Sequence, residues 1–287
     1  MREIRFSVPK QYDGVTLRGF LRSFVKLSAR QTAKLKRQPG GIRRNGGPVI
    51  APDLLHTGDS IVLTFQDDDM FILPAPLALS VIYEDEDLLI VDKPPFMPMY
   101  PCPGHNNDSL ANAVAFLQVS KGSDYAFRPV YRLDRDTTGL VLLAKNSYAA
   151  SRLSGNVRKT YLAVCEGYLV GSGRIDRPIG LKPGHSIQRA VVSEGQRAVT
   201  RWRSLFAGKR HSLVAVRLKT GRTHQIRVHF SAAGYPLAGD DMYGGSLDFI
   251  GRQALHCAKI SFLHPVTGKK MRFSSPLPKD MKALLSE

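Results

Sequence analysis

Apolar residues in the N-terminal quarter of the chain are spaced first as in helices and then as in strands. In the segment 15–25 they recur at every third or fourth position, with arginines on the opposite side, which predicts an amphipathic helix. A second helix is expected to begin at Ser28, because serine is a favoured N-cap residue. The Gly- and Asn-rich segment 40–49 predicts a β-hairpin, and the alternating segment 56–65 ends in a strand.

Two prolines mark a boundary between this region and the rest of the chain. Pro74 and Pro76 cannot lie in a central strand, so the segment around them is predicted to connect two domains. We expect a small α/β domain over residues 1–74 and a large domain over residues 80–287.

In the large domain, strand-like runs outnumber helical ones. Only two segments have good helical character, Asn107–Gln118 and Ser147–Val157. Strands and helices therefore do not alternate as in βαβ units, and we expect an α+β fold with a mixed, mainly antiparallel central sheet. The strand-like runs read LSVIYEDEDLLIVDKP, GLVLLAKN, TYLAVCEGYL, HSLVAVRLKT and ALHCAKISFLHP.

Composition adds a large positive charge to this picture. The chain has 287 residues, with 41 Lys and Arg against 24 Asp and Glu, so its formal net charge is +17. The excess is segregated: residues 14–52 contain nine cations and no acid, and residues 182–230 contain eleven cations and one acid, Glu194. Such blocks favour contact with the phosphates of a nucleic acid over a solvated surface of mixed charge.

Other features argue against membrane, secreted and cofactor-binding classes. No apolar run approaches the roughly 18 residues that span a bilayer, and the N-terminus lacks the apolar stretch of a secretory signal. Cys102, Cys165 and Cys257 are odd in number and far apart, which fits a reducing cytoplasm and no zinc site. Glycine motifs for nucleotide cofactors are not found in the sequence.

The first segment with candidate chemistry is RPVYRLDRDTTGLVLLAKN, residues 128–146. A strand-like run, PVYRL, is expected to lead into a turn and to leave as a second strand, which puts Asp134 on the turn. Aspartate before Thr-Thr-Gly is also ordinary turn chemistry. Arg132 and Arg135 flank it, however, and cations at this density would keep a carboxylate ionised even in a closed pocket.

The second segment is LKTGRTHQIRVHF, residues 218–230. Read as a strand, it presents a polar face that would line a site; a half-buried strand with a solvated face is the alternative. Metal binding is weakly supported, because His224 and His229 would lie on opposite faces of that strand. The residues of the polar face are Thr223, Gln225, Arg227 and His229.

Taken together, the segments between residues 80 and 280 resemble the RluA-type pseudouridine synthases, which isomerise uridines in ribosomal or transfer RNA. The resemblance is carried by ordered motifs, which are more specific together than singly. The N-terminal region resembles the small RNA-binding domain shared by ribosomal protein S-four and bacterial tyrosyl-tRNA synthetases, through S-A-R, I-R-R-N-G and L-x2-G-D-x-I. The motifs of the large domain include YRLDRDTTGLVLLAKN, RKTYLAVCEG, GQRAVTRW, LKTGRTHQIRVHFSAAGYPLAGDDMYG and RQALHCAKISFLHPVTG.

The resemblance implies a role for individual residues of the large domain. Asp134 matches the catalytic nucleophile of the family, and Arg227 matches the arginine that pairs with it. Tyr161 matches the active-site tyrosine, whose ring would stack on a flipped uracil and whose phenol would lie near the proton on carbon 5. Arg132 matches an arginine that fills the vacated base stack. Tyr131 departs from the family's usual histidine, and we expect it to have a supporting role.

RNA is the implied partner, as large-subunit ribosomal RNA or transfer RNA. Arg222 and His224 are expected to contact this RNA or to support the strand. Neither a cofactor nor a metal is implied, and we expect a cytoplasmic monomer. The predicted RNA contacts of the N-terminal domain are Arg30, Lys34, Arg37, Arg43 and Arg44.

Two other functions fit parts of the sequence. The chain would be a non-catalytic RNA-binding protein if its large domain were only a scaffold, but then at least one of the three matched catalytic residues would be expected to differ. An N-glycosylase would also use a carboxylate at a glycosidic bond and would release free base. Within the synthase reaction, the carboxylate can add to the uracil ring or act at the ribose, and the sequence does not choose between them.

Overall fold

The computed structural model describes residues 1–66 and 72–286, which form an N-terminal sheet, a large sheet and a small two-stranded sheet. The N-terminal sheet and the large sheet each have their own hydrophobic core. The N-terminal sheet has four antiparallel strands in the order β1-β4-β2-β3. Two helices pack on it and bury Leu17, Phe20 and Leu35. The elements are β1 (Arg2–Ser7), η1 (Lys10–Tyr12), α1 (Leu17–Ser23), α2 (Ala29–Arg37), β2 (Ile42–Arg44), β3 (Gly47–Pro48) and β4 (Ser60–Phe65).

Local signals in the N-terminal region produce the predicted elements. The Ser28 hydroxyl accepts from the backbone of Gln31, whose side chain reaches back to form a capping box, and α2 begins at the next residue. Asn45 and Gly46 both have positive φ, 48° and 85°, and connect β2 to β3 as a tight hairpin. The two predicted helices and the hairpin are therefore present.

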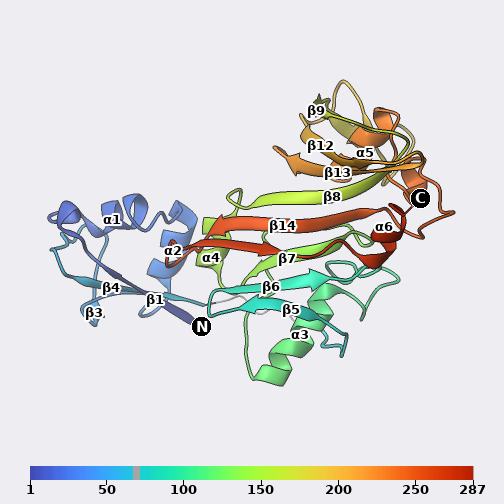
Figure 1. The fold of residues 1–287 in the computed structure, drawn as a ribbon. Helices are drawn as coiled ribbons and strands as arrows, with labels where there is room; N and C mark the ends of the chain where they lie inside the picture. Colours follow the sequence, from blue (N-terminus) through green and yellow to red (C-terminus); the bar gives the residue numbers. More distant parts are fainter. Residues whose placement is uncertain (67–71, 287) are drawn as a thin grey trace.

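The large sheet has nine strands in the order β5-β6-β7-β14-β8-β13-β12-β9, with β15 also paired to β14 (Figure 1). Among the strands of the described residues, only the pair β7 and β14 is parallel, which confirms the predicted α+β fold with a mainly antiparallel sheet. β10 and β11 form the small two-stranded sheet. The elements that follow the N-terminal region are β5 (Ser80–Glu84), β6 (Leu88–Lys93), α3 (Leu110–Lys121), β7 (Thr138–Ala144), α4 (Ser147–Leu153), β8 (Arg158–Glu166), β9 (Ser172–Asp176), β10 (Ile179–Leu181), β11 (Arg189–Val191), β12 (Val199–Ala207), β13 (His211–Leu218), α5 (Gln225–Ala232), η2 (Asp241–Tyr243), β14 (Leu255–Leu263), β15 (Lys270–Ser274) and α6 (Lys279–Ala283).

The helix bounds of the large domain differ from those expected. The helix predicted over Asn107–Gln118 begins only after Ser109, which caps it, and runs on to Lys121. The helix predicted to reach Val157 ends at Leu153. Capping explains the first shift, since Ser109 and Asn112 satisfy each other's free backbone amides, while Gly122 ends the helix with a left-handed residue.

Side-chain contacts join the N-terminal sheet to the large sheet. Tyr148 of α4 lies in the N-terminal core, with its ring 6.0 Å from Phe6 and 5.6 Å from Phe65. Arg2 donates two hydrogen bonds, of 3.0 and 3.1 Å, to Asp87 on the turn between β5 and β6. These contacts hold the basic N-terminal region at one end of the large sheet (Figure 1).

The predicted boundary between residues 74 and 80 stays a prediction, and residues 67–71 beside it lie outside the described residues. Within the described part of the chain, no helix is both long and apolar enough to cross a membrane.

Candidate active site

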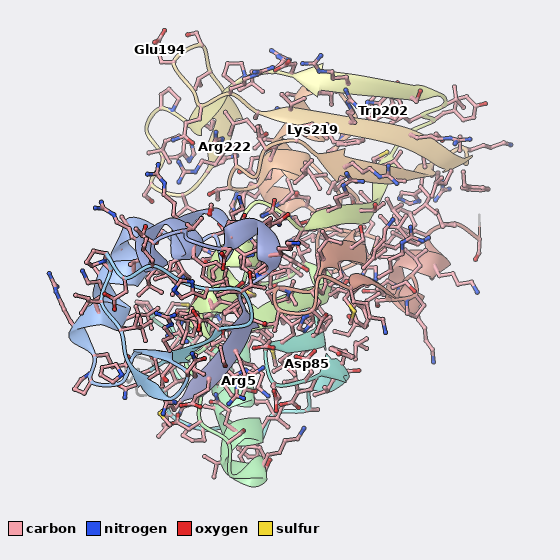
Figure 2. The ribbon with its side chains drawn as sticks, turned by 90° about the vertical axis from the view of Figure 1, so that its left-hand side faces the viewer. Arg5, Asp85, Glu194, Trp202, Lys219 and Arg222 are labelled. Carbon is pink, nitrogen blue, oxygen red and sulfur yellow. The ribbon has the colours of Figure 1, made fainter. Side chains whose placement is uncertain are left out.

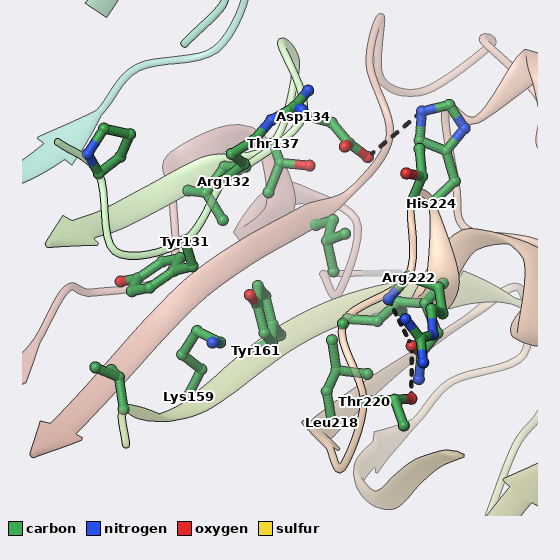
Figure 3. A pocket seen from close by; sticks show the side chains of 18 of the residues that line it. Tyr131, Arg132, Asp134, Thr137, Lys159, Tyr161, Leu218, Thr220, Arg222 and His224 are labelled. Carbon is green, nitrogen blue, oxygen red and sulfur yellow. Dashed lines mark hydrogen bonds and ion pairs between the residues drawn. The ribbon is translucent and has the colours of Figure 1, made fainter. Parts of the chain in front are cut away.

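A cavity of about 670 Å³ opens on the face of the large sheet against which α5 packs. Its walls come from the loop before β7, from β8 and from the loop between β13 and α5 (Figure 3). The three predicted catalytic residues, Asp134, Tyr161 and Arg227, all line this cavity. Arg132 and Arg222 line it as well, so residues that are up to 95 positions apart along the chain meet at one place.

Asp134 lies on a loop whose backbone is held by two buried basic side chains. The ammonium of Lys93 donates to the backbone carbonyl of Arg135 at 2.7 Å, and Arg252 donates to that of Asp136 at 3.3 Å. The loop leads into β7, whose second residue is Gly139; a Cβ atom there would come within 2.5 Å of the backbone of Cys257, so only glycine fits. Asp134 is thus presented with its side chain 30% exposed to the cavity.

The strand predicted before Asp134 is reduced to a single bridge. The run PVYRL, residues 129–133, pairs with the sheet only through Pro129 and Leu143. The backbone N–H of Val130 donates to the carbonyl of Leu142, and that of Ala144 donates to the carbonyl of Arg128, both at 2.9 Å. Pro129 lies between these two bonds, at a position of the antiparallel pair where no N–H is needed.

The predicted strand over residues 223–230 is wrong, because Gln225–Ala232 form the helix α5. The alternating apolar residues misled the prediction: the residues from Gln225 to Phe230 are all buried, so this short helix has no solvated face to mark its period. As a helix it points Gln225 and His229, four residues apart, at the hydroxyl of Thr200.

Helical spacing also brings His224 and Arg227 to the same carboxylate. Arg227 Nη1 lies 3.4 Å from Asp134 Oδ2. His224 Nε2 lies 4.0 Å from the same oxygen (Figure 3). His224 has a φ of 56°, a strained left-handed backbone that turns the chain into α5. On a strand these two side chains would have pointed to opposite faces.

Asp240 holds Arg227 more closely than Asp134 does. It accepts two hydrogen bonds of 2.7 Å from Nε and Nη2 of Arg227, and its side chain has no exposure to solvent. Burial opposes the charge of Arg227, but the hydrogen bonds and charge of Asp240 outweigh it and raise the pKa of Arg227. Arg227 is therefore a cation that is fixed in position, and its remaining NH2 group, Nη1, faces Asp134.

Tyr243 contacts and orients both side chains that face Asp134, Arg227 and His224. Its ring centroid lies 4.9 Å from the guanidinium carbon of Arg227, and its hydroxyl lies 2.8 Å from His224 Nδ1. That hydroxyl already accepts the backbone N–H of Arg189, so we assign its proton to His224 Nδ1, which leaves the Nε2 proton facing Asp134. Burial lowers the pKa of His224 and thus favours the neutral ring.

Tyr161 on β8 forms the floor of the cavity. It is 5% exposed, and burial raises the pKa of its phenol well above the ordinary value. Lys159 follows the same face of the strand and lies over the ring of Tyr131 at 4.4 Å. The Tyr131 hydroxyl donates to the carbonyl of Leu140 at 2.8 Å, which supports the strand that follows the Asp134 loop.

The remaining residues that were predicted to contact RNA differ in their exposure and in their partners within the protein. Arg132 is exposed beside Asp134, and Arg222 is exposed with its Nε donating to the carbonyl of Arg197 at 3.1 Å. Lys219 and Arg222 lie at the end of the large sheet that carries the N-terminal region (Figure 2).

The predicted RNA contacts of the N-terminal region fall into two groups. Arg30, Lys34 and Arg37 are exposed on α2. Arg43 pairs with Glu3, and Arg44 pairs with Asp59 at 2.7 Å, so these two also serve the fold.

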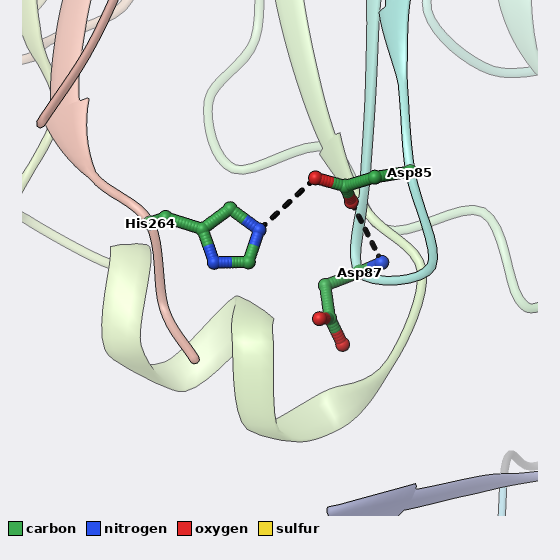
Figure 4. A group of neighbouring side chains, drawn as sticks. All are labelled: Asp85, Asp87 and His264. Atoms are coloured by element: carbon green, nitrogen blue, oxygen red, sulfur yellow. Dashed lines mark hydrogen bonds and ion pairs between the residues drawn. The ribbon is translucent and has the colours of Figure 1, made fainter. Parts of the chain in front are cut away.

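One group of acids and histidine among the described residues is close enough to hold a metal ion, Asp85, Asp87 and His264 (Figure 4). Its atoms already have partners. His264 Nε2 contacts Asp85 Oδ2 at 3.0 Å, while Nδ1 accepts from two backbone amides. Asp87 accepts from Arg2 and from Asn146. The group therefore joins the β5–β6 turn to its neighbours.

Asp240, Tyr243, Lys93 and Arg252 were not expected to have roles in the site. Asp240 lies in the LAGDDMYG segment, where two acids follow a block of almost purely basic sequence. That local reversal of charge is the signal that would have indicated a partner for a buried arginine.

The buried Lys93 provides a pH-dependent test of the loop. Burial is the main influence and lowers its pKa to about 7 from 10.5, although Asp136 and Asp134 favour the charged form. Above pH 7 the unfolded chain keeps a proton that the folded chain has lost, so the free energy of unfolding should rise with pH up to about 10.5, by at most about 1.4 kcal/mol per pH unit. Lys93→Met should remove this rise in urea titrations at pH 7, 8 and 9; equal slopes for both proteins would contradict it.

Comparison with known proteins gives a consistent result. The family model described as RNA pseudouridylate synthase matches residues 87–232. The uncharacterized RNA pseudouridine synthase YjbO of Bacillus subtilis is 40% identical over 90% of this chain and 94% of its own. Ribosomal large subunit pseudouridine synthase D of Pseudomonas aeruginosa is 38% identical over 84% of this chain and 82% of its own. The solved structure of human RNA pseudouridylate synthase domain containing 1 is 26% identical, with a TM-score of 0.57 over 72% of this chain and 86% of that one.

Proposed function

Since the chain belongs to the RluA-type family of RNA pseudouridine synthases, which are isomerases, we propose that it converts specific uridines of large-subunit ribosomal RNA to pseudouridine, with Asp134 as the nucleophile. The name of the relative from Pseudomonas aeruginosa supports large-subunit RNA as the substrate. Transfer RNA is the second candidate substrate.

The proposed reaction needs no external reagent. The bond from ribose carbon 1′ to ring nitrogen 1 breaks, the uracil turns, and carbon 1′ joins carbon 5, which loses its proton while nitrogen 1 gains one. Atoms and electrons balance within the nucleotide, so a carboxylate that forms and then releases one covalent bond is sufficient. Asp134 supplies that carboxylate, either to the ring or to the ribose.

The cavity suits a nucleotide that has been turned out of its RNA. A base inside a helix cannot be reached, and extruding it costs a few kcal/mol. Arg132, exposed beside Asp134, is proposed to fill the vacated stack with its planar guanidinium. Tyr161 on the cavity floor is proposed to stack on the uracil, and its phenol, kept neutral by burial, is proposed to act near the proton on carbon 5.

The observation that carries the proposal is the pairing of Arg227 with Asp134 inside the cavity that Tyr161 floors. Arg227 orients the carboxylate, and its own position is set by Asp240 rather than by the substrate. A non-catalytic scaffold would have no need to place a charged pair with a 30% exposed aspartate in an open cavity. An N-glycosylase remains chemically distinct, because it would release free uracil.

The proposed function predicts that deletion of the gene removes one or a few pseudouridines from large-subunit ribosomal RNA. Carbodiimide mapping of total RNA from the deletion strain and its parent is the measurement. Complementation with the native gene should restore the missing positions. An unchanged map in both ribosomal and transfer RNA would contradict the proposal.

We further propose that the protein acts as a monomer in the cytoplasm, where ribosomal RNA is processed. Asp134, Tyr161 and Arg227 already meet in one cavity, so the proposed site needs no residue from a second copy of the chain. The three cysteines are unpaired, which fits a reducing compartment.

A further inference from the structure

A row of cations crosses the large sheet on the face opposite the cavity. Arg174 of β9 pairs directly with Arg201 of β12, which pairs directly with Arg217 of β13. Arg217 Nε lies 3.3 Å from the hydroxyl of Thr160 on β8, and Thr160 pairs with Lys259 of β14. Five neighbouring strands thus present four cations in one line, about 19 Å long at the usual strand spacing.

Alternation along the strands assigns this row to the face away from the active site. Trp202, next to Arg201, packs toward α5 with its ring 6.3 Å from Phe230. Tyr161, next to Thr160, points into the cavity. Successive side chains of a strand point to opposite faces, so the row lies on the other side. We call the exposed residues of that side the back face: Arg158, Arg174, Arg201, Arg203, Arg217, Lys259 and Arg272.

Most of these cations have no partner within the described residues. Arg174 is paired with Asp176, and Arg217 donates to Thr160. Arg201 and Arg203 have neither an ion pair nor a side-chain hydrogen bond in the part of the chain that the structure describes, and the same holds for Arg158, Lys259 and Arg272. Like charges placed directly opposite each other on a sheet destabilise it.

Acids are scarce on the same strands. The six strands β9, β12, β13, β8, β14 and β15 contain only Asp176 and Glu166. Glu166 accepts from the backbone of Ser246, away from the row. A surface whose cations repel one another and are not neutralised by acidic residues of the protein is suited to binding a polyanion.

We propose that the back face binds the phosphate backbone of the substrate RNA, at a segment separate from the one that enters the cavity. The inference rests on the proposed action on RNA and adds a second contact on the opposite side of the sheet. A line of cations about 19 Å long is long enough to follow several phosphates of one strand. The large, folded target would then be held from two sides.

The test neutralises three back-face cations in the full-length protein: Arg201→Gln, Arg217→Gln and Lys259→Gln together. The control removes the same charge elsewhere, with Lys209→Gln, Lys279→Gln and Lys282→Gln, all exposed residues outside the back face. Binding to protein-free large-subunit ribosomal RNA from the deletion strain is measured between 50 and 200 mM salt, roughly the range over which phosphate contacts are resolved. Thermal unfolding serves as the folding check, and the back-face variant should be at least as stable as the native protein because repulsion is removed.

We expect the back-face variant to bind RNA about tenfold or more weakly, with a salt slope lower by about 2 to 3, and the control to change the slope by less than one. KM should rise more than kcat falls. Equal losses in both variants, or native affinity in the back-face variant, would overturn the inference. The inference would also be overturned if the back-face variant lost binding to anionic phospholipid vesicles but bound RNA as tightly as the native protein. If the native protein forms no pseudouridine but the back-face variant still binds RNA selectively less well, the proposed function fails and the RNA surface stands.

Discussion

Asp134→Asn is expected to lower pseudouridine formation by at least about 10⁴-fold while the protein still folds and binds RNA. Asparagine has nearly the same shape but lacks the charge that a nucleophile needs. Little stability should be lost, since the side chain is 30% exposed and Arg227 keeps its two hydrogen bonds to Asp240. Single-turnover conversion of ribosomal RNA from the deletion strain, with binding measured in parallel, is the experiment.

Asp136 offers a matched control two residues away on the same loop. It is paired with Arg135 and lies outside the cavity lining, so Asp136→Asn removes the same charge from the same turn without touching the proposed nucleophile. We expect it to retain turnover within about tenfold of the native protein. Turnover by Asp134→Asn comparable to that of Asp136→Asn would remove Asp134 from the nucleophile role.

Arg227→Met is expected to have the second large effect, and on stability as well as on activity. It would leave the fully buried carboxylate of Asp240 without a partner, and breaking a buried pair in this way costs about 3–5 kcal/mol. Turnover should also fall, because Asp134 loses the cation that orients it. Chemical denaturation gives the first quantity, and single-turnover kinetics at a temperature where the variant is folded gives the second.

Adding Asp240→Leu to Arg227→Met separates the two roles. The double variant replaces a buried ion pair by apolar groups, which is often neutral for stability, so most of the lost stability should return. Activity should not return, since neither substitution restores a cation beside Asp134. Recovery of activity together with stability would show that Arg227 has only a structural role.

Part of the fold follows from local patterns. The helices at residues 17–37, the hairpin at Asn45 and Gly46, and the strands of the large sheet are marked by caps, turn residues and apolar alternation that act within a few residues. The mainly antiparallel sheet follows from the excess of strands over helices. The family is likewise identified from ordered motifs, and the comparisons confirm it.

The helix α5 shows where local pattern fails. Its residues alternate between polar and apolar as in a strand, yet their environment is buried on all sides, so the period carries no information about solvent. The error matters, because only the helix brings His224 and Arg227 together on Asp134. The structure places Arg227 beside Asp134, although the secondary structure of its segment was predicted wrongly; the catalytic role of Arg227 stays a prediction.

The sequence by itself determined which residue types occur, which motifs they form, and that the chain carries +17 in separated blocks. Only the tertiary structure decided how those charges divide. It buries Arg227 between Asp134 and Asp240, uses Lys93 and Arg252 to hold the Asp134 loop, and leaves Arg201 and Lys259 in one line on the back face. The physical reason is that a charge acts over a few ångströms in space, and strand pairing and helix packing set those distances between residues far apart along the chain.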